Sequence, residues 1–151
     1  MAKVVKRCVE IKAKLAGEDE KDLKGKRALL NFGHTVAHGL EGILGYDGLR
    51  HGEAVAIGMV AEARLAVRLG LAAAAVPERI IEVVRAAGLP SALPLSLDRS
   101  ALLGATRQDK KARAGMTRFA LPAAIGQMAG ADQGYGIPVE EAAVLQILTE
   151  M

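Results

Sequence analysis

Six segments of this chain are predicted to be helices, the first of which places Val4, Val5, Cys8, Ile11 and Leu15 at helical spacing, whereas only one short run alternates as a strand does. The strand candidate is 117–122, and Pro122 would confine it to the edge of a sheet. This pattern predicts a mainly α, multi-helix domain with at most a small β-hairpin near 117–125. The predicted helices cover residues 2–16, 27–45, 51–69, 77–87, 98–106 and 138–149.

The composition agrees with a helical core. Hydrophobic residues make up 51% of the chain, only 3% is aromatic and there is no Trp. The core must therefore consist of Ala, Leu, Val and Ile; Ala and Leu favour helices, and Ala lets helices approach closely. A chain of 151 residues is one domain of ordinary size.

Local signals predict several helix ends. Asp98 is typical of an N-cap, and Gly70 of the residue that ends a helix. Pro77 and Pro138 suit first turns, where a missing backbone N–H costs nothing. The glycine-rich stretch 126–136 is expected to be a loop.

Several classes of protein are disfavoured. A net charge of +3 is weak for a nucleic-acid binder, and few aromatic side chains are present to stack on bases. Cys8 is the only cysteine, which excludes an intramolecular disulfide and suits a reducing compartment. The most apolar run, 54–60, is followed at once by Glu62 and Arg64 and cannot span a bilayer. We predict a cytoplasmic protein with no nucleic-acid or membrane partner.

All three histidines fall within one window: His34, His38 and His51. His34 and His38 are four residues apart and share a helix face, roughly 6 Å from each other. A turn at 46–48 would make the two flanking helices antiparallel and return His51 toward His34. Because neutral imidazole is a preferred ligand of transition metals, the cluster predicts a Zn²⁺ site that Co²⁺ could also occupy.

Two other interpretations of the histidine cluster must be considered: a zinc protease, and a purely structural role. Thr35 stands where the zinc-protease motif has its glutamate base, which disfavours a hydrolytic protease. Each histidine could instead simply cap or fill a helix contact. The neighbouring glycines support a functional site, because glycine inside a helix costs about 1 kcal/mol and often marks close approach of a ligand or another helix. They are Gly33, Gly39, Gly52 and Gly58.

Two motifs and their flanks resemble the C-terminal domain of the 3-dehydroquinate synthase family, which belongs to the sugar-phosphate cyclases. The matching segments occur in order over essentially the whole chain. They are 27–35 with His38 and Glu41 after it, 49–59, and the flanking 7–14, 109–111 and 118–126.

The resemblance implies roles for individual residues. His34 and His51 match the zinc ligands of the family, and His38 matches a substrate-site histidine implicated in proton transfer. The other matched positions contact the anionic sugar-phosphate substrate: Lys12, Arg27, Asn31, and either Lys110 or Lys111.

The resemblance also implies a reaction, in which a cyclising phosphate lyase of the shikimate pathway converts 3-deoxy-arabino-heptulosonate 7-phosphate to 3-dehydroquinate. In the family, NAD⁺ transiently oxidises a ring hydroxyl, phosphate is eliminated, the ketone is reduced back, and the opened ring closes by an aldol step. Zinc polarises hydroxyls, while Lys and Arg bind phosphate and carboxylate.

Part of the family pattern is missing. No Gly-x-Gly-x-x-Gly fingerprint follows a predicted strand, and the third zinc ligand of the family, a glutamate, falls upstream of Met1. We therefore expect residues 1–151 to be the helical zinc and substrate domain, without the NAD-binding domain and inactive alone. An NAD-binding domain could act in trans, and a homodimer is usual in the family. Glu41 and Glu53 are candidates to complete the metal site, to orient a histidine, or simply to cap a helix.

Two other functions stay open. The chain could belong to a sister cyclase of the deoxyinosose or valiolone synthase type, whose substrates lack the carboxylate, or it could be a non-catalytic remnant or interaction domain. Retention of Lys12, Arg27 and the 110–111 lysine pair argues against the first, and the intact histidine and asparagine set argues against the second.

Overall fold

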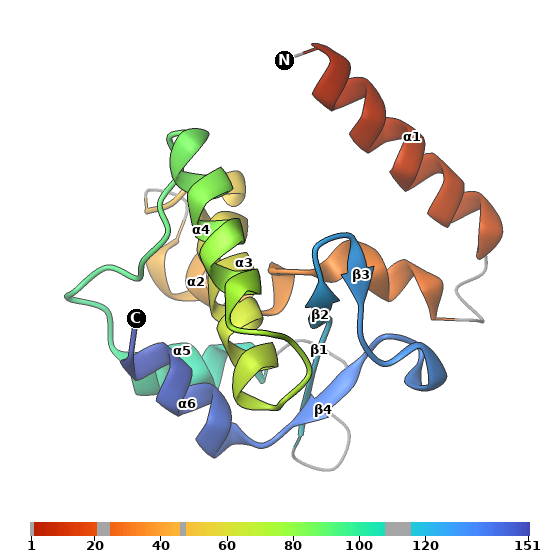
Figure 1. Cartoon of the computed structure of the whole chain (residues 1–151). Coiled ribbons are helices and arrows are strands. Elements are labelled where there is room, and N and C mark those ends of the chain that lie inside the picture. Colours follow the sequence, from red (N-terminus) through yellow and green to blue (C-terminus); the bar gives the residue numbers. More distant parts are fainter. Residues whose placement is uncertain (1, 21–24, 46–47, 108–115) are drawn as a thin grey trace.

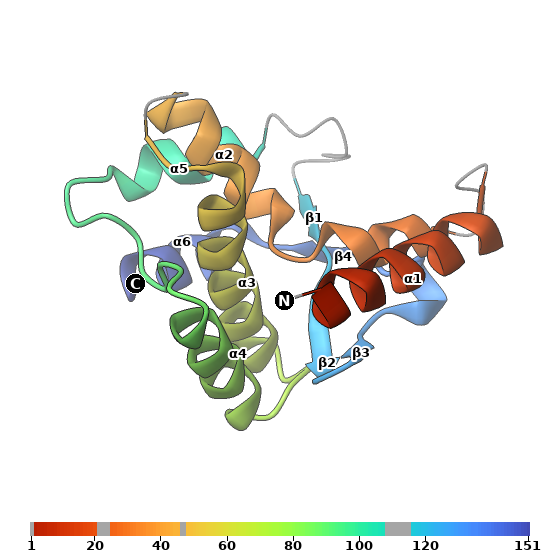
Figure 2. The ribbon, with the colours of Figure 1, turned by 90° about the horizontal axis from the view of Figure 1, so that it is seen from above.

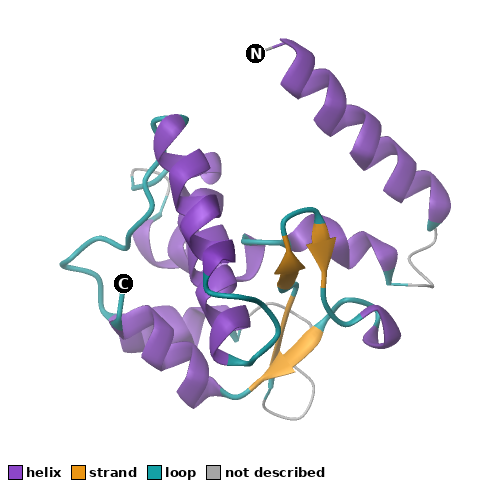
Figure 3. Ribbon diagram, in the orientation of Figure 1, coloured by secondary structure: helices purple, strands orange, loops and turns teal. Residues whose placement is uncertain are grey.

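The computed structural model describes residues 2–20, 25–45, 48–107 and 116–151. It is mainly helical with two small antiparallel sheets, which confirms the predicted fold class (Figures 1 and 3). The α-helices are α1 (Ala2–Glu18), α2 (His34–Leu44), α3 (His51–Arg68), α4 (Ala75–Ala86), α5 (Arg99–Thr106) and α6 (Glu141–Thr149), and the 3₁₀ helices are η1 (Lys26–Asn31) and η2 (Ala131–Gln133).

The centre of the domain is an antiparallel pair formed by α2 and α3. Glu41 near the end of α2 meets His51 at the start of α3, while Gly33 before α2 meets Glu62 far along α3. Helices α5 and α6 pack beside this pair and share one apolar core with it, in which Leu40, Leu102 and Leu148 are buried. Alanines line much of α3, and their small side chains allow this close packing.

Helix α4 covers another face of α3 and forms a second apolar cluster. Val60 of α3 packs with Ile80, Ile81 and Val84 of α4. Pro77 lies in the first turn of α4, as predicted. None of the helices in the described ranges is long and apolar enough to cross a membrane.

The strands form two separate two-stranded sheets beside the helical group of α2 to α6 (Figure 2). Strand β1 (Thr117–Phe119) pairs with β4 (Ile137–Val139), and β2 (Pro122–Ala124) forms a hairpin with β3 (Gln127–Met128). The predicted strand 117–122 is thus divided between two sheets rather than one hairpin. The partner of β1 lies far along the chain, in a segment too short to show alternation.

Helix α1 extends the predicted 2–16 helix to Glu18, and its N-terminal half points away from the rest of the domain (Figure 1). None of its side chains is buried. The exposed apolar residues include Val4, Val5, Val9 and Ile11. Because the helix makes so few contacts, its position depends on the polar junction at its C-terminal end.

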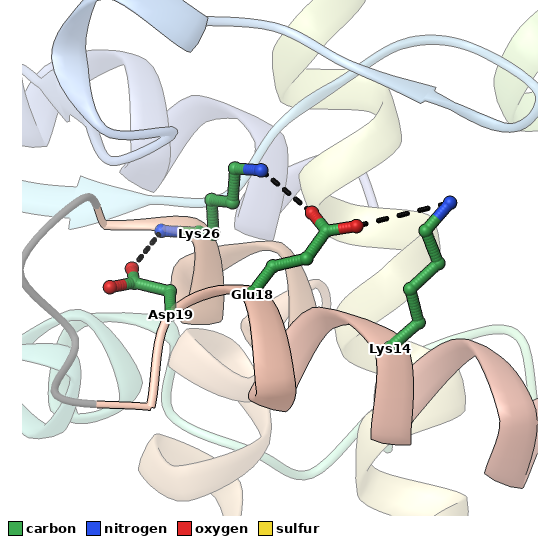
Figure 4. Close-up of polar contacts among 4 residues, drawn as sticks. All are labelled: Lys14, Glu18, Asp19 and Lys26. Carbon is green, nitrogen blue, oxygen red and sulfur yellow. Dashed lines mark hydrogen bonds and ion pairs between the residues drawn. The ribbon is translucent and has the colours of Figure 1, made fainter.

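That junction links α1 to η1 through carboxylates (Figure 4). The Asp19 Oδ2 accepts a hydrogen bond from the backbone N–H of Lys26 at 2.9 Å. The ammonium of Lys26 lies 2.6 Å from Glu18 Oε2, and the Nζ of Lys14 lies 3.9 Å from the other oxygen of Glu18. Hydrogen bonding and charge attraction from Glu18 raise the pKa of Lys26 above its ordinary value.

Two predicted helix boundaries were wrong. The predicted helix 27–45 is interrupted at 32–33, because Gly33 adopts a left-handed conformation with φ of 83° and separates η1 from α2. Pro138 is in β4 and not in a helix, and α6 starts three residues later after Glu140. The loop predicted at 126–136 contains β3 and η2.

Other helix ends match the prediction. Gly70 ends α3 with φ of 71°, where a left-handed residue lets the next N–H groups reach the last carbonyls of the helix. The carboxylate of Asp98 accepts hydrogen bonds from the backbone N–H groups of Ser100 and Ala101 at 2.8 and 3.1 Å. It therefore satisfies two of the donors left open at the start of α5.

Replacing Asp98 by alanine is expected to lower the free energy of unfolding by about 1 kcal/mol, because both donors lose their acceptor. Urea denaturation followed by circular dichroism measures this change. Asp98→Asn is the control and should remain near wild type, since its amide oxygen can still cap the helix. A loss of equal size in both variants would show that capping is not the cause.

Candidate functional site

The three histidines come together as predicted. His34 is the first residue of α2, His38 lies one turn further on, and His51 is the first residue of α3. The ring centre of His34 lies 5.8 Å from that of His38 and 5.4 Å from that of His51. His34 is half-buried while the other two are exposed, so solvent and small ligands can reach the cluster.

Hydrogen bonds orient two of these rings through their Nδ1 atoms. His51 Nδ1 donates to Glu41 Oε1 at 2.8 Å, and His34 Nδ1 donates to the carbonyl oxygen of Phe32 at 3.2 Å. In the neutral form of either ring, Nδ1 then carries the proton and Nε2 the lone pair. Carboxylate and carbonyl partners of this kind usually orient metal-binding histidines.

The donor set suits zinc but is incomplete. Two imidazoles bound to one tetrahedral zinc place their ring centres roughly 5 Å apart, close to the separation of His34 and His51. Within the described ranges, no group of three His, Cys, Asp or Glu residues is arranged to hold a metal ion. Glu53 accepts a hydrogen bond from the backbone N–H of Arg50 at 2.8 Å, which is the acidic half of a capping box. Glu41 therefore orients a histidine, and Glu53 caps α3.

The backbone before His34 is fixed by an unusually close crossing with α3. A methyl group at Gly58 would overlap the carbonyl oxygen of Gly33 and lie 2.9 Å from its carbonyl carbon. A methyl group at Gly33 would lie 2.7 Å from the carbonyl oxygen of Val55. The close approach expected from these glycines is confirmed at both positions and at Gly39, which faces α5, but Gly52 has open space around it.

A buried carboxyl completes this crossing, and the sequence pattern did not single it out. Glu62 of α3 is fully buried and accepts hydrogen bonds from the backbone N–H groups of Gly33 at 2.6 Å and Val36 at 3.4 Å. It thus caps the start of α2 from another helix. Burial raises the pKa of Glu62 to about 8, and the backbone donors, including that of Thr35, only partly offset the effect. The one sequence signal that could have indicated this role was a glutamate within an apolar part of a predicted helix.

A cavity of about 280 Å³ opens beside two of the three histidines. Three residues expected from the sequence line it: Asn31, His34 and His38. Lys12 and Arg27 are exposed on α1 and η1 and are not among its lining residues, while Lys110 and Lys111 lie outside the described residues. The remaining lining residues are Gly25, Ala28, Thr35, Arg118, Phe119, Ala120, Gly134, Tyr135 and Gly136.

Known structures share this architecture. 2-Deoxy-scyllo-inosose synthase, solved with carbaglucose-6-phosphate, NAD⁺ and Co²⁺, matches 97% of this chain and 39% of its own, with a TM-score of 0.82 and 22% identity. ValA, the 2-epi-5-epi-valiolone synthase of Streptomyces hygroscopicus subsp. jinggangensis 5008, solved with NAD⁺ and Zn²⁺, matches 99% of this chain and 39% of its own, with a TM-score of 0.80 and 25% identity. The fold is that of the sugar-phosphate cyclases.

Sequence relatives identify the family within this class. The family model described as 3-dehydroquinate synthase C-terminal matches residues 1–112. The 3-dehydroquinate synthase of Synechococcus sp. is 45% identical over 130 residues, which cover 86% of this chain, and that of Caldanaerobacter subterraneus subsp. tengcongensis is 46% identical over 125 residues, which cover 83%. The chain belongs to the 3-dehydroquinate synthase family. It spans about a third of the length of these relatives, since the matched region covers 35% of each.

Proposed function

We propose that this chain is the zinc- and substrate-binding part of a 3-dehydroquinate synthase, acting on 3-deoxy-arabino-heptulosonate 7-phosphate in the cytoplasm. The observation that carries the proposal is the convergence of His34 and His51, each with its Nδ1 engaged and its Nε2 available. A bound zinc ion would polarise the hydroxyls of the substrate. The family assignment supports this choice of reaction.

Under this proposal, the other predicted site residues have roles in substrate binding and proton transfer. Asn31 lines the cavity and can hydrogen-bond a substrate hydroxyl, and His38 lines it with an imidazole that can take up or release a proton. Lys12, Arg27 and one of Lys110 and Lys111 are proposed to approach the anionic groups once a substrate and the NAD-binding part are in place. That part could be a domain in trans, and the active form could be a homodimer.

A second candidate is supported by the structural neighbours. Both 2-deoxy-scyllo-inosose synthase and the valiolone synthase share this fold over nearly the whole chain. A sister cyclase would use a sugar phosphate that lacks a carboxylate. The two candidates therefore differ in a chemical group of the substrate, which an activity assay can distinguish.

A chimera tests the proposed function. The matched C-terminal region of the Synechococcus enzyme would be replaced by this chain, and phosphate release would be measured with NAD⁺ and either the heptulosonate phosphate or glucose 6-phosphate. We expect release from the heptulosonate phosphate, none from this chain alone, and none from the chimera carrying His34→Ala. Release from glucose 6-phosphate alone would indicate the sister cyclase. A folded chimera inactive with both substrates would contradict a catalytic role.

Glu41→Gln is expected to weaken zinc binding by about 10- to 100-fold, because a carboxylate that orients a metal-binding histidine also raises its basicity. Competition with a chromophoric chelator measures the affinity. Glu53→Gln is the matched control: it lies in the next helix and keeps its capping role, since glutamine also serves in a capping box. If both variants lowered affinity equally, the Glu41–His51 contact would not be the cause.

A further inference from the structure

One wall of the cavity carries the cationic side chain of Arg118, which is not part of the histidine cluster. Arg118 is the central residue of β1, and its neighbours Thr117 and Phe119 point into the core, so the alternation of the strand directs Arg118 outward. Among the described residues that line the cavity, Arg118 is the only side chain with a permanent charge, and no Asp or Glu is present.

The guanidinium is held in place by backbone and not by an opposite charge. Arg118 Nη2 donates to the carbonyl oxygen of Gln133 at 3.3 Å. A methyl group at Gly136 would lie 3.1 Å from Arg118 Nε, so the glycine allows the guanidinium to lie against the backbone. Within the described part of the chain, no carboxylate pairs with Arg118.

The turn beside Arg118 is itself constrained. Tyr135 has φ of 58°, a left-handed conformation that costs a non-glycine residue of the order of 1 kcal/mol, and its N–H donates to the carbonyl oxygen of Gly130 at 2.7 Å. Gly25 packs against Gly134 so closely that a methyl group at Gly25 would lie 2.8 Å from the Cα of Gly134. Strained backbone of this kind is concentrated at ligand sites.

We propose that Arg118 binds an anionic oxygen group, phosphate or carboxylate, of the substrate that enters the cavity beside His34 and His38. The proposal rests on the proposed function for the identity of the substrate. A cavity of about 280 Å³ suits a monosaccharide-sized ligand, and a guanidinium without a carboxylate partner offers paired N–H donors that fit either anion. Arg118 would determine specificity for charged over neutral sugars.

Calorimetric titration of the full chain tests this role with two probes. The heptulosonate phosphate carries both anionic groups, whereas 3-dehydroquinate carries only the carboxylate. Arg118→Gln is expected to raise the Kd for the heptulosonate phosphate about 10- to 100-fold, and Arg118→Lys to have a smaller effect, since lysine keeps the charge and loses the planar fork. Arg79→Gln, on the exposed side of α4, is the control and should not change binding.

The same titrations distinguish the two anionic groups. An equal loss for both probes assigns Arg118 to the carboxylate, and a loss confined to the heptulosonate phosphate assigns it to the phosphate. Wild-type affinity in Arg118→Gln, or no binding of either probe by the wild type, would overturn the inference.

Zinc binding by the same proteins separates this inference from the proposed function. If His51→Ala lost zinc while Arg118→Gln kept its ligand affinity, the proposed function would be supported and the role of Arg118 would be contradicted. Zinc binding that is unchanged in His51→Ala, together with weakened ligand binding in Arg118→Gln, would contradict the proposed function and support the role of Arg118.

Discussion

Gly58→Ala should destabilise the chain by about 3 kcal/mol or more and distort the start of α2. The new methyl group would overlap the carbonyl oxygen of Gly33, and this neighbour is backbone, which cannot rotate away as a side chain can. Relief therefore requires that α2 and α3 separate. Because His34 directly follows Gly33, the variant should also lose affinity for zinc. Urea denaturation and a zinc titration measure the two effects.

Gly52→Ala is the matched control for this prediction. Gly52 lies in the same helix, and a methyl group there meets nothing within 4 Å. Alanine is favoured over glycine in a helix by up to about 1 kcal/mol, so this variant should be as stable as the wild type or more so. Equal losses in the two variants would show that the crossing between Gly33 and Gly58 is not the cause.

Glu62→Leu should cost about 3–5 kcal/mol of stability, a result comparable to that for Gly58→Ala. Leucine leaves the buried N–H groups of Gly33 and Val36 without the acceptor they have in the wild type, at roughly 1–3 kcal/mol for each unsatisfied group. Glu62→Gln should cost less, because its amide oxygen can still accept one of these bonds. Chemical denaturation of the three proteins at one pH ranks them. If Glu62→Leu proved as stable as the wild type, these bonds would not anchor α2.

The raised pKa of Glu62 predicts a particular pH dependence. Between the ordinary value of 4.5 and about 8, the folded chain keeps the proton of Glu62 while the unfolded chain has lost it. The folded state then binds more protons, so the stability due to Glu62 falls as pH rises through this window, by a few kcal/mol in total. The difference in stability between wild type and Glu62→Gln should therefore shrink from pH 5 to pH 8. A constant difference would contradict the raised pKa.

The sequence was informative where structure depends on local signals. Helix α3 follows from apolar periodicity with Gly70 at its end, and α5 follows from Asp98 at its start. The meeting of His34 with His51 was also predictable, because the turn expected at 46–48, whose first two residues lie outside the described ranges, allows the two flanking helices to pair antiparallel. These features depend on residues close in the chain.

Features that depend on distant residues were not predictable. The break before α2 comes from Gly33 meeting Gly58 and Glu62, whereas the predicted helix ran unbroken over 27–45. Pro138 suited a first helical turn, yet it pairs with Arg118 in a sheet. That pairing also brings Arg118 and the turn at Tyr135 to the cavity wall, and the sequence gives no direct sign of it.

Metal binding by the purified chain tests the central claim most directly. Co²⁺ would be titrated while its visible absorption is recorded, and the same titration repeated with His34→Ala, His51→Ala and His38→Ala. We predict one ion per chain, bound more weakly than in a site with three protein ligands, lost in the first two variants and retained in His38→Ala. Binding that survives in both His34→Ala and His51→Ala, or no binding by the wild type, would contradict the account.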